Sequence, residues 1–275
     1  MSVGHVYFIG AGPGAPDLIT IRGRTVLERA DLIIYADSLV DPHICDGARP
    51  DAEIHGSSSL TLEEISERMI TAARAGKVVA RVQSGDPTIY GAIHEQIARL
   101  DAASVPWTIV PGVSSAFAAA AALGVELTVP EVAQTVILTR ISGRASPVPS
   151  PEALRSLAAH RTSLVLFMSI SYVARVVADL VAGGYPPETP VAAVYRVTWP
   201  DEAAVRGTLA DIAAKVRAAR WKKQALILVG AVLGTDVGAD GHRSRLYAGD
   251  YSHLFRKKRD PKGAPARPAG EAAAS

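Results

Sequence analysis

Three glycine-containing corners interrupt the first half of the 275-residue sequence, and their residue types suit loops that contact a ligand. The corners are "GAGPGAP" (10–16), "SGDPTIYG" (84–91) and "VPGVSSAFAAAAALG" (110–124). Each follows a short apolar run that is typical of a buried strand. Glycine tolerates positive φ and lets the backbone approach a bound molecule closely. Ligands of open α/β sheets bind outside the carboxyl ends of strands, so three such corners predict one shared binding site.

The corner at Gly85 predicts a strand, a turn and a helix in direct succession. Residues 78–82 form an apolar run, and Gly85, Asp86 and Pro87 follow it. Asp86 is a suitable N-cap and Pro87 suits the first turn of a helix. Apolar residues at 89, 93, 97 and 100 would then share one helical face.

The corner at Gly10 also fits a loose dinucleotide-binding fingerprint, G-x-G-x-x-A, through Gly10, Gly12 and Ala15. An NAD(P)-binding α/β protein is therefore one alternative, and a rigid turn without a ligand is another. Pro13 and Pro16 argue against a dinucleotide site, because they remove two N–H groups that such a loop would aim at a pyrophosphate.

Cysteine and histidine usage predicts neither a metal site nor a covalent mechanism. Cys45 is the single cysteine, so the chain cannot form an internal disulfide. His43 and Cys45 are close in sequence, but no cluster has the spacing of a zinc site. We place these two residues in a strand edge or loop, and we do not expect Cys45 to act as a nucleophile.

Composition indicates a soluble globular protein with a large core, since 48% of the residues are hydrophobic and 20% are charged. The sequence shows no signal peptide or membrane span, so we expect a cytoplasmic protein without a membrane partner. The net charge of +2 arises in residues 254–275, and residues 1–253 are net negative. This distribution disfavours nucleic acid as a partner. We expect residues 254–275 to form a disordered basic tail.

Strand and helix patterns alternate along the rest of the chain, which predicts two α/β domains with mostly parallel sheets. The expected boundaries are 1–131 for the N-terminal domain and 132–253 for the C-terminal domain. We expect strands at 5–10, 31–36, 77–82, 107–110, 135–140, 163–169, 190–197 and 225–232. We expect helices around 26–30 and at 61–76, 87–100, 114–124, 151–160, 172–184 and 205–220.

The three corners together resemble the signature stretches of the tetrapyrrole (corrin and porphyrin) methyltransferases, and the resemblance extends over about residues 3–235. Within that family, "TVPEVAQTVILTRISGRASPVPSPEAL" (128–154) and "YRVTWPDE" (195–202) are similar to the members that methylate C-11 of precorrin-4 or cobalt-precorrin-4 in cobalamin (vitamin B12) biosynthesis. The resemblance implies an S-adenosylmethionine-dependent enzyme with a cofactor cleft between its two domains. It also implies a homodimer and a precorrin substrate.

Carried over residue by residue, the resemblance implies a set of contacts to S-adenosylmethionine. They are Pro13, Ser84, Gly85, Asp86, Ser114, Ser115, Met168, Ala193 and Ala225. Methyl transfer from a sulfonium to a ring carbon depends mainly on positioning, so we assign no catalytic side chain.

The implied substrate carries acetate and propionate groups, which arginine binds well. Our candidates for binding it are Arg140 and Arg144, followed by Arg81, Tyr90 and Arg196. Any of these arginines could equally be a solvated surface charge.

Further alternatives remain at this point. Another tetrapyrrole methylase, acting on precorrin-2, precorrin-3 or uroporphyrinogen III, shares the motifs. An RNA methyltransferase of the same fold also does, although the negative body disfavours it.

Overall fold

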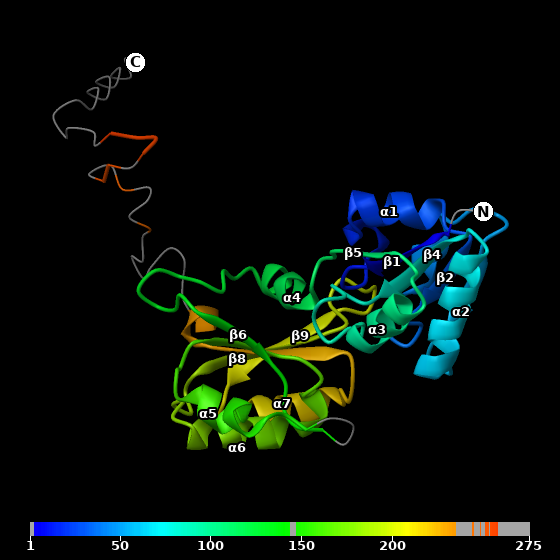
Figure 1. Cartoon of the computed structure of the whole chain (residues 1–275). Helices are drawn as coiled ribbons and strands as arrows, with labels where there is room; N and C mark the ends of the chain where they lie inside the picture. Colours follow the sequence, from blue (N-terminus) through cyan, green and yellow to red (C-terminus); the bar gives the residue numbers. More distant parts are fainter. Residues whose placement is uncertain are drawn as a thin grey trace, which may run out of the picture.

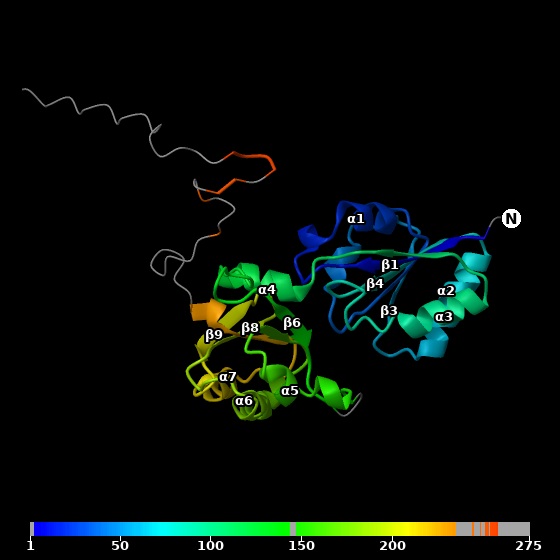
Figure 2. The same ribbon diagram turned by 60° about the vertical axis from the view of Figure 1, so that its left-hand side comes forward.

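Two five-stranded sheets lie beside each other in the computed structural model, each covered by helices on both faces (Figures 1 and 2). The structure describes residues 3–143, 147–234, 244, 248, 251–252 and 254–257. The two α/β domains predicted from the sequence are confirmed. None of the helices in these ranges is long and apolar enough to cross a membrane.

The first sheet is entirely parallel, with the strand order β3-β2-β4-β1-β5. Its strands are β1 (His5–Gly10), β2 (Leu32–Tyr35), β3 (Glu53–Gly56), β4 (Val78–Gln83) and β5 (Trp107–Val110). One face is covered by α1 (Ile21–Glu28), and the other by α2 (Leu62–Arg74) and α3 (His94–Ala102). The neighbouring strands β1 and β4 therefore lead to helices on opposite faces. This divergence opens a crevice at their carboxyl ends, where α/β sheets bind ligands.

The helix predicted after the Gly85 corner begins later than expected. α3 starts at His94, and the backbone between the corner and α3 contains two non-glycine residues with positive φ, Tyr90 (54°) and Ala92 (49°). A right-handed helix cannot include such residues. Asp86 is therefore not a helix cap, and residues 86–93 form an irregular loop. By contrast, the predicted capping box of α2 is present between Thr61 and Glu64.

The second sheet has the order β6-β7-β10-β8-β9, and only β6 and β7 pair in parallel. Its strands are β6 (Val136–Thr139), β7 (Ser163–Leu166), β8 (Pro190–Tyr195), β9 (Ala203–Thr208) and β10 (Ala225–Val229). Mostly parallel pairing thus holds for the chain as a whole but not for this sheet. The helix predicted over 205–220 is wrong in its first part, because 203–208 form β9 and α7 covers only Ile212–Ala219. A strand that returns directly after β8 must run antiparallel to it.

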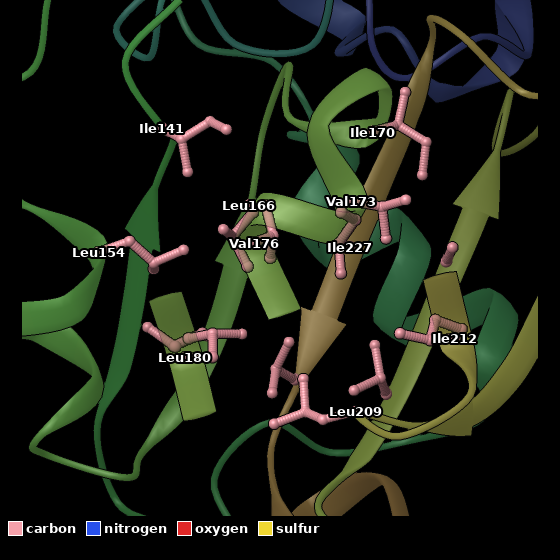
Figure 3. Close-up of a cluster of buried hydrophobic side chains, with 14 of the residues drawn as sticks. Ile141, Leu154, Leu166, Ile170, Val173, Val176, Leu180, Leu209, Ile212 and Ile227 are labelled. Carbon is pink, nitrogen blue, oxygen red and sulfur yellow. The ribbon is translucent and has the colours of Figure 1, made fainter. Parts of the chain in front are cut away.

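Helices sandwich the second sheet (Figure 1). On one face lie α5 (Leu154–Ala158), α6 (Val173–Ala182) and α7, whose apolar side chains pack against those of the sheet in the core shown in Figure 3. On the other face lies α4 (Ser115–Leu123), whose alanines pack against β7, β8 and β10. By packing, α4 belongs with the second sheet, although it precedes the boundary expected at residue 131.

Short 3₁₀ turns complete the described chain, at Pro16–Leu18, Pro42–Cys45, Ser150–Glu152, Ile170–Tyr172 and Ala231–Gly234. Cys45 lies in the second of these turns, where burial raises the pKa of its thiol to about 11. A thiol in this state is a poor nucleophile at neutral pH. Of the predicted basic tail, residues 258–275 lie outside the described residues.

Candidate active site

A pocket of about 460 Å³ opens between the two domains, at the carboxyl ends of the first sheet. The second domain contributes the ends of β7 and β8 and the start of β10. Its lining is mostly apolar with a few polar groups, as is typical of small-molecule sites. The lining residues are Pro13, Ala36, Ser38, Leu39, Gln83, Ser84, Gly85, Asp86, Ile89, Tyr90, Gly91, Ser114, Ser115, Phe167, Met168, Ile170, Val194, Arg196, Val197, Trp199, Lys222, Lys223, Gln224, Ala225 and Leu226.

The three glycine corners meet at the base of this pocket. A Cβ atom on Gly10 would lie 2.5 Å from the carbonyl oxygen of Gly85 and 2.5 Å from the Cα atom of Gly112. The corners are also joined by backbone hydrogen bonds, since Gly85 N donates to Gly12 O (2.7 Å) and Gly12 N donates to Gly85 O (3.2 Å). Glycine is therefore required at residues 10 and 112, because a Cβ atom at either position would collide with the backbone of a neighbouring corner.

Asp86 fastens the second corner to the third. Its carboxylate accepts hydrogen bonds from the Thr88 N–H (2.8 Å) and hydroxyl (2.5 Å), and its other oxygen accepts one from Gly112 N–H (2.9 Å). Burial acts to raise the pKa of Asp86, but the hydrogen bonds from Thr88 and Gly112 outweigh it and hold the pKa below the usual value. The carboxylate is thus ionised at neutral pH, and both of its oxygens are engaged within the protein.

Ser114 and Ser115 form the start of α4 at the pocket wall. Ser114 is the N-cap of this helix, and its hydroxyl accepts a hydrogen bond from Ala116 N–H. The nitrogen of Ser115 lies 3.7 Å from the position that a Cβ atom on Gly85 would take. The positive end of the α4 dipole therefore faces the Gly85 corner.

Several lining residues have a backbone conformation that is costly outside glycine. Tyr90, Met168, Arg196 and Gln224 all have positive φ, and they come from different segments of both domains. Met168 is 62% exposed, which is unusual for a large apolar side chain. Strained residues of this kind concentrate at functional sites.

The loop that follows β8 holds the two domains together beside the pocket. The indole N–H of Trp199 donates to Pro13 O (3.2 Å), and Ala15 N–H donates to the Thr198 hydroxyl (2.9 Å). The guanidinium of Arg196 lies 4.1 Å from the centre of the Trp199 ring and forms an ion pair with Asp201 at 2.7 Å. Arg196 is thus committed in part to contacts inside its own domain.

Most of the residues named from the sequence lie together in this pocket. The lining includes Pro13, Ser84, Gly85, Asp86, Ser114, Ser115, Met168, Ala225, Tyr90 and Arg196. Ala193 does not reach it, because it is fully buried in the core beneath α5–α7, and its neighbour Val194 lines the pocket instead. Successive residues of a strand face opposite sides of the sheet, which explains why Val194 lines the pocket and Ala193 does not.

The other substrate candidates have different surroundings. Arg81 is 5% exposed inside the first domain, where its guanidinium donates to the side chains of Gln96 and Ser57 and to Ile34 O. Burial lowers its pKa to about 10, which leaves it charged, and it does not line the pocket. Arg140 follows β6, bonds to Pro147 O and lies close enough to Tyr90 to affect the Tyr90 pKa. Arg144 lies outside the described residues.

The lining residues that were not predicted from the sequence include Gln83, Trp199 and the Lys222–Lys223 pair. Gln83 is 7% exposed, and its buried side-chain nitrogen has no hydrogen-bond partner in the described structure. Because Gln83 lies directly before Ser84, its position in the sequence could have identified it as a residue of the site. Lys222 and Lys223 precede β10. The parallel β10 expected from the sequence would have placed them at the end of the sheet that faces away from the pocket.

The arrangement suits a small molecule held largely by backbone and apolar groups. Among the residues that the structure describes, no three His, Cys, Asp or Glu side chains are grouped as a metal site. Among the described residues, the side-chain nitrogen of Gln83 has no hydrogen-bond partner, and together with the glycine corners it offers a donor and close backbone approach to an organic ligand.

Fold and site together define a two-domain α/β protein with a small-molecule pocket between its domains. The chain belongs to the tetrapyrrole (corrin/porphyrin) methylases, whose family model matches residues 5–213. It is 50% identical to the cobalt-precorrin-4 C(11)-methyltransferase of Methanocaldococcus jannaschii, over 92% of this chain and 96% of that protein. It is 46% identical to the precorrin-4 C(11)-methyltransferase of Pseudomonas aeruginosa, over 91% of this chain and 98% of that protein.

Solved structures agree with these relatives. An X-ray structure of a cobalt precorrin-4 methyltransferase, described as a cobalamin biosynthetic enzyme, superposes with a TM-score of 0.81 at 46% identity, covering 83% of this chain and 95% of that one. The uroporphyrin-III C-methyltransferase of Thermus thermophilus complexed with S-adenyl homocysteine gives a TM-score of 0.71 at 29% identity, covering 84% and 99%.

Proposed function

We propose that this chain is an S-adenosylmethionine-dependent methyltransferase that methylates C-11 of precorrin-4, or of its cobalt complex, in cobalamin biosynthesis. The observation that carries the proposal is the 45–50% identity to cobalt-precorrin-4 C(11)-methyltransferases over 92% of the chain. The relatives include enzymes named for the cobalt-free and for the cobalt-containing substrate. The choice between these two substrates is left to the experiment below.

S-adenosylmethionine binds in the interdomain pocket in this proposal. The proposed contacts are Pro13, Ser84, Gly85, Asp86, Ser114, Ser115, Met168 and Ala225, with Val194 in place of Ala193. Gly85 lines the pocket, and a Cβ atom there would lie 3.7 Å from Ser114 Cα and from Ser115 N, two residues that also line it. Asp86 contributes by holding the Gly85 and Gly112 corners together, since its carboxylate is already hydrogen-bonded to Thr88 and Gly112.

The reaction requires positioning rather than a nucleophilic side chain. A carbon–carbon bond forms at C-11 while the sulfur–methyl bond breaks, sulfur keeps the electron pair, and the substrate releases a proton. Bound S-adenosylmethionine supplies a methyl group that its sulfonium charge has already activated. The chain's own part is to align the two reactants and to exclude water with apolar groups such as Phe167, Val194 and Leu226.

Further parts of the proposal concern the substrate site and the assembly. Arg140, Arg144, Tyr90 and Arg196 remain candidates for tetrapyrrole contacts. The enzyme is proposed to act as a cytoplasmic homodimer without a bound metal. Light scattering after size-exclusion chromatography tests the dimer, cell fractionation tests the location, and activity after EDTA treatment tests the requirement for metal.

Ligand binding tests the cofactor assignment. Calorimetry with S-adenosylmethionine and S-adenosylhomocysteine, in EDTA, should show binding of both, while NADH should give no heat. NADH binding without binding of either sulfur compound, by a folded sample, would instead identify a nucleotide-binding protein.

A further inference from the structure

Two adjacent lysines, Lys222 and Lys223, lie at the rim of the interdomain pocket. Both are exposed, and the described structure gives neither ammonium group a carboxylate or hydrogen-bond partner. They belong to the turn between α7 and β10. Because β10 is antiparallel to β8, its start lies at the same edge of the sheet as the end of β8.

This turn is fixed to three separate parts of the protein. The Gln224 carbonyl accepts a hydrogen bond from Arg196 N–H (2.8 Å), and the Gln224 side chain donates to Ser38 O of the first domain (3.3 Å). The Lys222 carbonyl accepts a hydrogen bond from the Ser171 hydroxyl. Gln224 also has positive φ (54°). The backbone that carries the two lysines is therefore anchored rather than a free surface loop.

Among the charged residues of the pocket lining, Lys222 and Lys223 are the two whose side chains have neither an ion pair nor a hydrogen bond in the described structure. The other ionised lining residues are Asp86, whose oxygens are hydrogen-bonded to Thr88 and Gly112, and Arg196, which is paired with Asp201. The ammonium groups of Lys222 and Lys223 thus remain available for an anionic ligand at the pocket rim.

We propose that Lys222 and Lys223 bind carboxylate groups at the periphery of the tetrapyrrole substrate. The inference rests on the proposed function and adds substrate-binding residues to it. Two reactants supply carboxylates, the tetrapyrrole and the methionine part of the methyl donor. Two adjacent exposed lysines suit several carboxylates at the edge of a large substrate better than a single one deep in the pocket. The flexible stem of lysine can also follow mobile acetate and propionate arms.

Steady-state kinetics tests this assignment with Lys222→Ala, Lys223→Ala and the double variant. Exposed ion pairs are weak, so each single variant should raise the KM for precorrin-4 by about two- to fivefold, and the double variant by at least about fourfold. We expect kcat and the Kd for S-adenosylmethionine to stay within about twofold of the parent. Lys→Arg variants should restore most of the loss, and added salt should raise the parent's KM more steeply than the double variant's.

Arg217→Ala is the matched control, because it removes an exposed positive charge from the end of α7 without touching the pocket. Its KM and Kd values should equal those of the parent. A double variant with the parental KM would overturn the inference. So would an equal loss of S-adenosylmethionine affinity, which would place the methyl donor's carboxylate at these lysines.

A binding measurement separates this inference from the proposed function. Fluorescence titration with uroporphyrin, a stable polycarboxylated porphyrin, should show weaker binding by the double variant than by the parent and by Arg217→Ala. Weakened uroporphyrin binding together with no methylation at C-11 would support the lysine site and contradict the proposed reaction. Methylation at C-11 with unchanged KM and unchanged uroporphyrin binding would do the reverse. Absence of both methylation and binding by the parent would count against both.

Discussion

The carbonyl oxygen of Gly85 lies 2.1 Å from the position that a Cβ atom on Gly112 would occupy. No side chain fits between these two corners, so their contact depends on glycine at residue 112. Asp86 reinforces the contact by accepting a hydrogen bond from Gly112 N–H at 2.9 Å. The proposed cofactor site therefore rests on direct contact between the backbones at Gly85 and Gly112, which we call the backbone junction. Substitutions that add a side chain at these glycines test whether the site depends on this junction.

Gly112→Ala should lower the free energy of unfolding by at least about 2 kcal/mol, because the methyl group must displace backbone atoms. Urea unfolding measures this change. Gly143→Ala is a suitable control, since no atom of the described residues lies within 4 Å of the methyl group that it would add. Equal stability of the two variants would show that the junction can open without cost.

Gly85→Val should abolish S-adenosylmethionine binding while the protein still folds. Gly85 has φ +64°, but a Cβ atom there would meet its nearest neighbours only at 3.7 Å, so the fold can accept it. The strain of a left-handed valine costs about 1–2 kcal/mol or somewhat more. Gly124→Val carries the same strain, since Gly124 has φ +67° and, in the described part of the chain, nothing lies within 4 Å of a Cβ atom there. Calorimetry should show that Gly85→Val loses S-adenosylmethionine binding and that Gly124→Val keeps it. Unchanged affinity in Gly85→Val would show that Gly85 serves only to form the turn.

Asp86→Asn should destabilise the protein by about 1–3 kcal/mol, because an amide cannot accept all three hydrogen bonds that the carboxylate accepts. The pKa of Asp86 is lowered in the folded state, so its stabilising contribution is fully present above the unfolded value of 3.8 and disappears as pH falls through the folded pKa. The difference in stability between parent and variant should therefore be constant from about pH 5 to 8 and shrink below about pH 4. Urea unfolding across pH measures it. A difference that changes between pH 6 and 8 would assign the effect to another group.

Replacing Arg140 and Arg144 together by Ala should raise the KM for precorrin-4 about tenfold and leave S-adenosylmethionine affinity nearly unchanged, since each lost charge-assisted hydrogen bond costs about 1.5–3 kcal/mol before screening by water. Lysine at both positions should restore only part of the loss, because a point charge cannot form a bidentate pair. Parental substrate affinity in the double variant would make both arginines surface charges.

The sequence predicts most of the first domain, because β1, β2, β4 and β5 are apolar runs that alternate with helices, and three of these strands end in glycine corners. It does not predict β3. It predicts the second domain less well. Residues 203–208 continue an Ala- and Val-containing pattern into α7, and only packing against β8 makes them a strand. A helix in place of β9 would make β10 parallel to β8, whereas β10 is antiparallel to it. This difference in direction explains why Lys222 and Lys223 were not predicted at the pocket.

Side-chain orientation limits what the sequence says about the site. Ala193 and Val194 are adjacent and both apolar, and only the sheet decides that Val194 faces the pocket. Arg81 immediately precedes the residues that lead into the Gly85 corner, yet it points into the core of the first domain, where Gln96 and Ser57 bind it. The backbone corners were predictable because glycine itself carries the signal.

The proposed reaction is tested most directly by locating the transferred methyl group. The protein is incubated with S-adenosylmethionine carrying a ¹³C-labelled methyl group and with precorrin-4 or cobalt-precorrin-4, and the product is examined by NMR. We expect a single new methyl signal at C-11, and the faster of the two reactions identifies the natural substrate. A methyl group at another ring position, or no transfer to either compound by a sample that binds S-adenosylmethionine, would contradict it.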